Sequence, residues 1–437
     1  MEPSPKPFPR DSSPDATLAL LREGYGFISN RCRRLRSDVF ETRLMLSRVT
    51  CAMGEDAAEM FYHPGRFTRK QALPPTALML LQDVGSAQVL DGDAHRHRKR
   101  MLMSLVDEDR VRDLVANFED AWQARIPAWT AMEQVVLHTE VEQLLCAAVC
   151  QWAGVPLTPA AVEQRAGEFA AMIDGAGAIG PRNWRGLLLR VRTEEWARSI
   201  IEGVRAQHIG VPEGSPAHMI AMHREPDGSL LDSQSAAVEL INLLRPTVAV
   251  ARYMTFSALA LHRFPECRDT IRGNGADWLE CFVQEVRRFY PFFPSVGGRA
   301  RHAFDWRGTH FPAGTWVLLY LYGTNHDQRI WGDPEVFRPE RFRNWNRNAY
   351  RFVPQGGGEA ATGHRCPGER LTVALAMTAA RLLATGMDYD VPDQDLRIDM
   401  ARIPAIPKSR FVIANVTRTG AFDQESRVLR GREPHMH

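Results

Sequence analysis

The sequence lacks any run of about 18 uncharged apolar residues, which excludes a conventional membrane-spanning helix. It also lacks an excess of one charge. Its 54 Lys and Arg oppose 52 Asp and Glu, so the net charge of +2 gives no global reason to expect nucleic acid or an anionic membrane as a partner. The first residues, M-E-P-S-P-K-P-F-P-R, are proline-rich and do not resemble a signal sequence. We therefore expect a cytoplasmic protein with no stable membrane anchor and no nucleic-acid partner.

Paired cysteines are missing too. The seven cysteines, an odd number without C-x-x-C spacing, argue against a disulfide framework and a structural zinc site; they are Cys32, Cys51, Cys146, Cys150, Cys267, Cys281 and Cys366. Cys146 and Cys150 lie four residues apart in an apolar stretch typical of a helix core. Cys366 alone has a distinctive context, because it follows a glycine-rich segment.

The remaining composition, 44% hydrophobic and 24% charged residues, is that of an ordinary globular protein. Without repeats or low-complexity linkers, we expect a flexible arm at 1–15, one domain at 16–417 and a polar tail at 418–437. Apolar spacing predicts helices over 105–126, 133–152, 159–174, 183–208, 234–262, 276–290 and 366–386. Strand patterns cover 27–31, 39–45, 42–53, 310–323 and 410–416. The predicted fold class is mainly α with a minor β sheet.

The segment 352–370, F-V-P-Q-G-G-G-E-A-A-T-G-H-R-C-P-G-E-R, places Cys366 at the start of a predicted buried helix. Glycines without a Cβ let the backbone bend and approach a flat group closely; they are Gly356, Gly357, Gly358 and Gly363. A thiolate at a helix N-terminus lies near unpaired N–H groups, which lowers its pKa and makes it a ready metal ligand. A lone cysteine before a helix is also commonly a small buried hydrophobe, so this loop alone leaves both interpretations open.

The apolar stretch 236–261 suits a helix through the middle of the molecule, interrupted by Arg245 and Pro246. The proline removes one helical N–H and is expected to open the turn near Asn242. Burying a guanidinium without an anion is costly, so Arg245 should face one. That anion is either a protein glutamate or a substrate carboxylate held by two parallel N–H···O bonds.

A third pattern joins distant charges. Glu285 and Arg288 lie at i and i+3 on one predicted helix, and Arg341 follows in the segment 337–342, F-R-P-E-R-F. The three side chains can form a buried cluster. An E-x-x-R pair by itself is too common to identify a function.

In this order and spacing, the three segments resemble the cytochrome P450 superfamily, and within it the bacterial peroxygenases that hydroxylate or decarboxylate fatty acids with hydrogen peroxide. The resemblance covers about 25–416. It implies a cytochrome P450 fold, with haem b between a long central helix and the loop of its thiolate ligand, Cys366. Glu285, Arg288 and Arg341 then correspond to the structural Glu-Arg-Arg cluster of that family.

Two departures from ordinary P450s favour the peroxygenase branch. Glu359 and Thr362 stand where the usual haem loop has phenylalanine and glycine, and this longer loop is typical of that branch. Arg245 and Pro246 replace the acid–threonine pair that relays protons in monooxygenases. The resemblance implies that a fatty acid carboxylate on Arg245 moves a proton between the two oxygens of hydrogen peroxide and promotes cleavage of their bond. No redox partner is then required.

The resemblance also assigns the substrate pocket. The segment 78–88 corresponds to the helix over the haem and places Leu81, Gln82 and Gln88 there. Gln88 is a neutral amide and a poor proton donor, which accompanies hydroxylation rather than decarboxylation. The remaining expected substrate contacts are Ile173, Ala176 and Ala249.

Phe292 and Phe293, in Y-P-F-F-P, bear on regioselectivity. A second phenylalanine, where other members have glycine, resembles the strictly α-hydroxylating members, because its bulk narrows the acyl channel. Both rings are also consistent with core packing. The expected reaction is hydroxylation at Cα in preference to Cβ, with minor decarboxylation.

For the haem propionates the resemblance selects His95, Lys99, Arg299 and His364, with Lys99 in the place of an arginine. The alternative for this basic run is a solvated helix face, which we prefer for Arg98. Two rival functions stay open: a conventional P450 monooxygenase that needs electron-transfer partners, and a haem-binding sensor or carrier without turnover.

Overall fold

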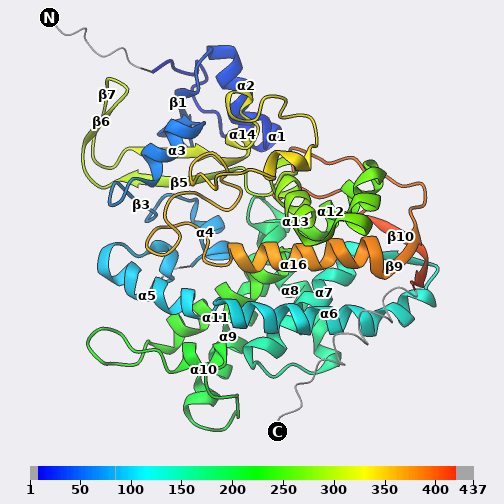
Figure 1. The fold of residues 1–437 in the computed structure, drawn as a ribbon. Coiled ribbons are helices and arrows are strands. Elements are labelled where there is room, and N and C mark those ends of the chain that lie inside the picture. The colour runs from blue at the N-terminus through cyan, green and yellow to red at the C-terminus, as the bar shows by residue number, and fades with distance from the viewer. Residues whose placement is uncertain (1–7, 84, 420–437) are drawn as a thin grey trace, which may run out of the picture.

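The computed structural model describes residues 8–83 and 85–419. Helices dominate the molecule, and a five-stranded sheet lies near its N-terminal end (Figure 1). The class is mainly α with a minor β component, as the sequence predicted.

In chain order the helices are α1 (Thr17–Glu23), α2 (Gly26–Leu35), α3 (Glu55–Tyr62), α4 (Pro75–Leu81), η1 (Ala87–Val89), α5 (Gly92–Ser104), α6 (Glu108–Thr130), α7 (Leu137–Ala153), α8 (Pro159–Gly175), α9 (Pro181–Arg205), α10 (Pro216–Ala221), α11 (Ser233–Ala249), α12 (Ala251–Arg263), α13 (Pro265–Phe289), α14 (Leu321–Thr324), α15 (Gln328–Trp331), η2 (Pro339–Phe342), α16 (Glu369–Arg381) and η3 (Leu382–Gly386). The strands are β1 (Val39–Leu44), β2 (Ser47–Ala52), β3 (Phe67–Thr68), β4 (Gln134–Val136), β5 (Ser295–Ala300), β6 (Phe304–Trp306), β7 (Thr309–Phe311), β8 (Trp316–Tyr320), β9 (Met387–Asp390) and β10 (Val412–Arg418).

The larger sheet has the order β1-β2-β8-β5-β3, with β2 and β8 parallel and the other neighbours antiparallel. Met45 and Leu46, at φ of 51° and 61°, form the turn between β1 and β2. Such positive φ values suit a tight hairpin turn. The continuous strand predicted over 42–53 is therefore two strands.

The strand predicted over 27–31 is wrong, because these residues belong to α2. Phe27, Ile28, Arg31 and Cys32 are buried. This spacing covers one face of a helix, whereas a half-buried strand would bury alternate residues.

The central helices α11 and α12 are buried on nearly all sides. The predicted interruption at Arg245 and Pro246 is wrong: α11 continues through both, and the boundary with α12 lies at Val250. The proline removes only one N–H donor, and packing around the helix stabilises that turn. The helix α16, which follows the cysteine loop, packs against α6, α12 and α13 (Figure 1).

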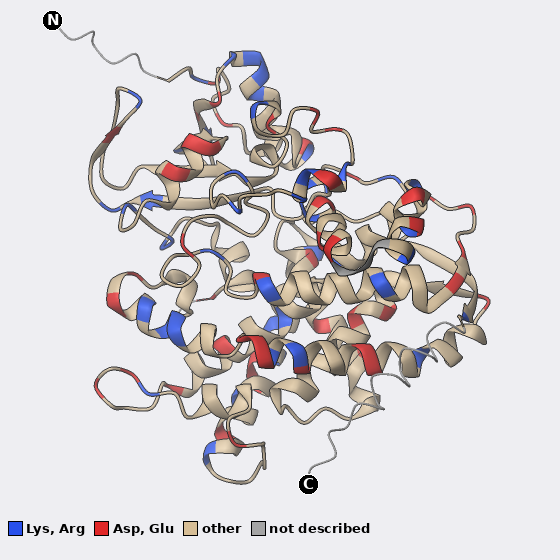
Figure 2. Ribbon diagram, viewed as in Figure 1, with Lys and Arg blue, Asp and Glu red and all other residues tan. Residues whose placement is uncertain are grey.

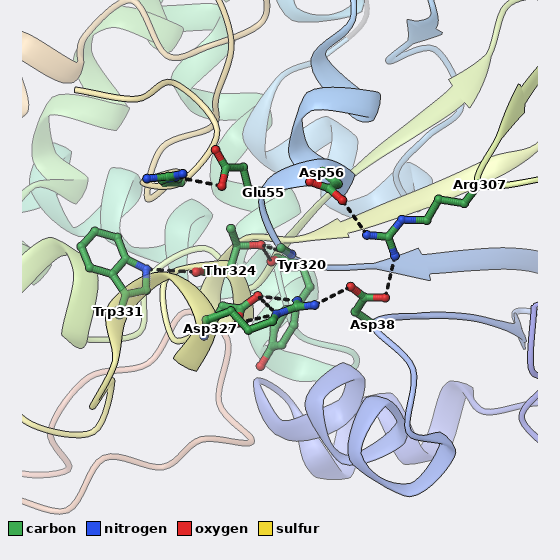
Figure 3. A network of polar contacts seen from close by, with 11 residues as sticks. Asp38, Glu55, Asp56, Arg307, Tyr320, Thr324, Asp327 and Trp331 are labelled. Atoms are coloured by element: carbon green, nitrogen blue, oxygen red, sulfur yellow. Dashed lines mark hydrogen bonds and ion pairs between the residues drawn. The ribbon is translucent and has the colours of Figure 1, made fainter. Parts of the chain in front are cut away.

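Ion pairs connect the N-terminal sheet to the segments before the cysteine loop (Figure 3). Asp38 pairs with Arg307 at 2.9 Å and with Arg329 at 3.0 Å. Glu55, at the start of α3, pairs at 2.8 Å with Arg351, which directly precedes the loop. The pair of Glu55 with Arg351 joins α3 to the start of the loop, although each of these partly exposed pairs contributes little to stability.

Residues 8–15 of the predicted arm lie against the domain. Phe8 packs on Phe311, and Asp11 forms a buried ion pair with Arg31 at 2.8 Å. Residues 1–7 and the tail from 420 onward lie outside the described residues. Across the described part of the chain, no helix has the combined length and apolarity needed to cross a bilayer.

Candidate functional site

The glycine-rich loop is shaped by its contacts with the protein itself. Gly356 and Gly358 take up φ of 95° and 75°, a region that favours glycine. A Cβ on Gly357 would lie 2.6 Å from the carbonyl oxygen of Ala349, and one on Gly358 would lie 2.9 Å from Cβ of Tyr62. The loop therefore packs tightly on α3 and directs Cys366 towards the start of α16.

In the described part of the chain, one side chain donates a hydrogen bond to the sulfur of Cys366. Nε2 of Gln355 donates to Sγ at 3.7 Å and to the hydroxyl of Thr372 at 3.1 Å. The other end of the same amide accepts from Arg287 of α13 at 2.9 Å. Cys366 is the one partly exposed cysteine among the described residues, since the other six are buried.

The pKa of Cys366 corrects one expectation. We predicted that the helix N-terminus lowers it, but burial raises the pKa of this thiol above its usual value, and Glu369 adds to the rise. The N–H of Gly368 and the charges of Lys99 and Arg287 act in the opposite direction without outweighing the loss of water. A positive partner such as a metal ion is needed to hold the thiolate at neutral pH.

The predicted Glu-Arg-Arg cluster is present. Arg288 donates to both carboxylate oxygens of Glu285 at 2.7 and 2.8 Å, and Nε of Arg341 lies 3.3 Å from Oε1. Arg288 also donates to the carbonyl oxygen of Asn325 at 3.0 Å, and the side chain of Asn325 accepts the N–H of Val353 at 3.0 Å. The cluster thus supports the cysteine loop through Asn325.

A basic cluster lies beside the loop. His95 and Lys99 are one turn apart on α5, a helix rich in Lys and Arg (Figure 2), and the ring of His95 lies 4.2 Å from that of His364. Lys99 donates to the carbonyl oxygen of Arg365 at 2.5 Å. Burial lowers the pKa of His95 to about 4 and that of Lys99 to about 8. At neutral pH the imidazole is therefore neutral and the ammonium is charged.

Sequence reasoning missed Arg69. Its half-buried guanidinium lies 4.3 Å from the ring centroid of Phe61 and donates to the carbonyl oxygen of Gly297 at 2.7 Å. Burial lowers the pKa of His364 to about 2, with Arg69 as the next cause, which places this arginine near the basic cluster. Among the described residues, neither Arg69 nor Lys99 has a carboxylate partner within 4 Å. The available signal, R-K after a two-residue strand, was too weak to find it.

Of two other arginines, Arg98 differs from expectation, whereas the propionate role of Arg299 stays a prediction. Arg299 donates to the carbonyl oxygens of Gln71 at 2.7 Å and Gly314 at 3.3 Å, and no contact within the described chain joins it to the basic cluster. Arg98 was expected on a solvated face, but it is buried and pairs with Glu239 of α11 at 3.1 Å and with Glu225. That expectation was wrong because the side of α5 carrying Arg98 faces α11.

Arg245 is buried, with 4% of its surface exposed, and has no carboxylate within 4 Å among the described residues. Its guanidinium donates to the carbonyl oxygens of Leu80 and Leu81, and to Oδ1 of Asn242 at 3.2 Å. Burial lowers its pKa to about 9, and repulsion from Arg190 adds to the effect. The side chain is still a cation at neutral pH. Because its acceptors among the described residues are neutral oxygens, the alternative of a structural ion pair with a protein glutamate is wrong.

The segment predicted to lie over the haem is held by α11. Asn242 donates to the carbonyl oxygen of Gln82 at 2.8 Å, and Glu239 accepts the N–H of Ala87 at 2.7 Å. Gln82 and Gln88 each leave Oε1 buried without a hydrogen-bond partner. Such oxygens are costly unless a ligand or water meets them, so this segment has the character of a binding surface.

The residues predicted to line the acyl channel belong to the apolar core. Ile173 and Ala249 are 4% and 7% exposed, and Ala176 packs against the same cluster. Phe292 is buried, with its ring 4.8 Å from Tyr253 of α12. Phe293 is 37% exposed and contacts Phe292 edge-on at 4.4 Å. Their role in selectivity stays a prediction.

Within the described residues, no group of three or more His, Cys, Asp or Glu is arranged to hold a metal ion. A metal at Cys366 would therefore have at most one further ligand of these types from the described chain. A prosthetic group that brings ligands of its own would suit such a site.

Comparison with known proteins gave consistent results. The family model described as cytochrome P450 matches residues 277–384. Among curated proteins, cytochrome P450 4A7 of Oryctolagus cuniculus is 30% identical over 210 residues, which is 43% of this chain and 38% of that protein. The alignment thus spans about two fifths of that relative.

Solved structures match over far more of the chain. A mutant of cytochrome P450SP alpha (CYP152B1) is 49% identical, covering 93% of this chain and 100% of its own, with a TM-score of 0.91. Cytochrome P450EX alpha (CYP152N1) with myristic acid is 39% identical over 95% of this chain and 100% of its own, with a TM-score of 0.91. A form of cytochrome P450 OleT with arachidonic acid is 34% identical over 95% of this chain and 99% of its own, with a TM-score of 0.91.

Proposed function

Since the chain belongs to the cytochrome P450 family, and within it to the group that contains P450SP alpha and P450EX alpha, we propose that it hydroxylates long-chain fatty acids beside the carboxyl group with hydrogen peroxide. Two structural relatives were solved with the fatty acids myristic acid and arachidonic acid. The observation that carries the proposal is the buried guanidinium of Arg245, which has no carboxylate within 4 Å among the described residues.

The residues present fit haem b. Cys366 supplies a single thiolate, and Arg69 and Lys99 are cations without carboxylate partners within the described chain, as two propionates require. His95 and His364 add N–H donors beside them. The buried Oε1 atoms of Gln82 and Gln88 fit a second ligand. When bound, the haem iron supplies the oxidising power that places an oxygen atom on a C–H bond.

Arg245 performs the recognition step. Two N–H groups of a guanidinium hold a carboxylate in a fixed orientation, and a dry site strengthens that bond. The head group replaces the carbonyl oxygens of Leu80 and Leu81 as the principal acceptor. Held there, the carboxylate serves as acid and base for the two oxygens of hydrogen peroxide. It takes the place of the acid–threonine pair of ordinary monooxygenases, where α11 has Arg245 and Pro246. No electron-transfer partner is then needed.

Anchoring the head group restricts reaction to the first carbons of the chain. We expect Cα to be favoured over Cβ, because Phe292 and Phe293 narrow the approach of the acyl chain. Gln88 is a neutral amide and donates protons poorly, so decarboxylation should be minor. Ile173, Ala176 and Ala249 are the expected channel contacts.

The test is turnover without a reductant. Haem-loaded enzyme, a saturated long-chain acid and hydrogen peroxide should give 2-hydroxy acid by mass spectrometry, whereas a conventional monooxygenase needs NAD(P)H with a reductase and a haem sensor gives no product. Arg245→Ala should lower kcat/KM by about 30-fold to 5,000-fold, since losing a buried charge pair costs about 2–5 kcal/mol. Its haem absorbance spectrum should be intact. The control is Arg347→Ala, whose side chain is 81% exposed. Undiminished turnover in Arg245→Ala would refute the carboxylate mechanism.

A further inference from the structure

The first half of α9 exposes a stripe of large apolar side chains. Trp184, Leu188 and Val191 are 66%, 68% and 55% exposed, and Ile179 just before the helix is 69% exposed. Residues at i, i+4 and i+7 lie on one helix face. Single exposed apolar residues are ordinary, but a row of this kind marks an interaction site.

The charges on the same face have one sign. From Gly175 to Thr193 the sequence has no Asp or Glu and has four arginines. Of these, Arg185 and Arg192 are exposed beside the apolar stripe, while Arg190 is buried and pairs with Asp83 and Glu194. Acidic side chains return to the exposed surface of α9 only at Glu195. We call Ile179, Trp184, Arg185, Leu188, Val191 and Arg192 the apolar-basic face.

We propose that the apolar-basic face docks reversibly on an anionic lipid bilayer. Exposed arginines beside a row of large apolar residues that includes a tryptophan suit the boundary between phosphate headgroups and acyl chains. A second copy of this chain is a poorer occupant, because a two-fold contact would bring Arg185 and Arg192 against the same charges of the partner. The balanced net charge does not oppose this, since the effect is local.

The opposite side of the same helix faces the proposed substrate site. A Cβ on Gly186 would lie 3.3 Å from Leu80, whose carbonyl oxygen accepts from Arg245, and Asn183 donates to the carbonyl oxygen of Gly175 at 3.0 Å. If the proposed function holds, the helix that touches the lipid surface thus packs directly on the segment that positions the acid. Fatty acids dissolve in bilayers, so docking would bring the enzyme to its substrate.

The experiment measures binding of the haem-loaded full chain to sedimented vesicles. Vesicles of equimolar phosphatidylglycerol and phosphatidylcholine should retain the protein at low salt and release it at high salt, whereas pure phosphatidylcholine should retain little. Leu188→Glu and the double variant Arg185→Glu with Arg192→Glu should each weaken binding about tenfold or more. The matched control is Met132→Glu, which introduces the same charge at another exposed apolar side chain. Met132 is 39% exposed and lies outside α9, between α6 and β4. The variants should keep the haem spectrum.

Equal binding to both vesicle types, or loss of binding in the control alone, would overturn the proposal. A wild-type dimer that dissociates in Leu188→Glu, without any lipid binding, would instead assign the face to a second copy. Vesicle binding is measured separately from turnover. A protein that binds the vesicles but gives no hydroxy acid in the turnover assay would refute the proposed function and leave the docking site standing.

Discussion

Replacing Glu285 by alanine tests whether the Glu-Arg-Arg cluster stabilises the fold. The carboxylate has no exposed surface and accepts from Arg288 twice, from Arg341, and from the backbone N–H of Arg338 at 2.8 Å. Removing it leaves two guanidinium groups without their anion, one of them fully buried. We expect a loss of about 3–5 kcal/mol in the free energy of unfolding.

That loss of unfolding free energy corresponds to a lower midpoint temperature of thermal unfolding. For 437 residues at about 2.1 cal/mol/K each, the entropy of unfolding is about 0.9 kcal/mol/K, so the midpoint should fall by about 3–5 °C. The assay is a circular dichroism melt of the haem-loaded protein with haem content measured in parallel. The matched control is Glu280→Ala, five residues earlier on α13, because its pair with Arg347 is exposed and should be worth less than about 1 kcal/mol. Equal midpoints for the two variants would refute the reasoning.

Further outcomes follow from single residues. Asp174→Asn should reduce the loss of stability in acid. Despite burial, Arg252 and two further arginines hold the pKa of the Asp174 carboxyl below 3.8 in the folded protein. Its contribution to stability is therefore present above pH 3.8 and is lost as the pH falls through the lower folded pKa, which urea titrations from pH 3 to 7 will measure. Gly297→Ala should destabilise by about 1–3 kcal/mol, because the new Cβ would lie 2.2 Å from the carbonyl oxygen of Ala72, whereas Gly273→Ala, in open space on α13, should stabilise by about 0.5–1 kcal/mol in the same melts. Cys366→Ala should abolish the thiolate signature in the carbon monoxide difference spectrum.

The sequence predicted those parts of the fold whose signal is local. The helix at 159–174 is observed as Pro159–Gly175, because a proline at its first turn and apolar spacing agree. The start of α13 at Pro265 was missed by eleven residues, from 276, since its first two turns are mostly polar and bury few apolar side chains, Cys267 and Ile271. The segment 27–31 misled because short apolar runs do not distinguish a strand from a helix.

Site residues divided in the same way. Motif spacing predicted that Glu285, Arg288 and Arg341 lie together, and the cost of burying a cation singled out Arg245. The roles of Cys366 and Arg245 stay predictions. Arg69 and Glu239 were missed because their importance depends on contacts between distant segments, which one sequence does not display. The pKa of Cys366 was predicted in the wrong direction, since burial outweighs the helix terminus.

The amide of Gln355 has a consequence for the sulfur. Arg287 has only donors, so the amide oxygen must face it, and the NH₂ end is turned towards Cys366 and Thr372. Arg287 of α13 thus determines which end of the Gln355 amide faces the sulfur, although it does not contact the sulfur itself. Gln355→Glu would keep an acceptor for Arg287 but would place a carboxylate oxygen near the sulfur in place of the NH₂ group. The side chain would keep nearly the same shape, while the attraction between the N–H and the sulfur would become repulsion between the oxygen and the sulfur.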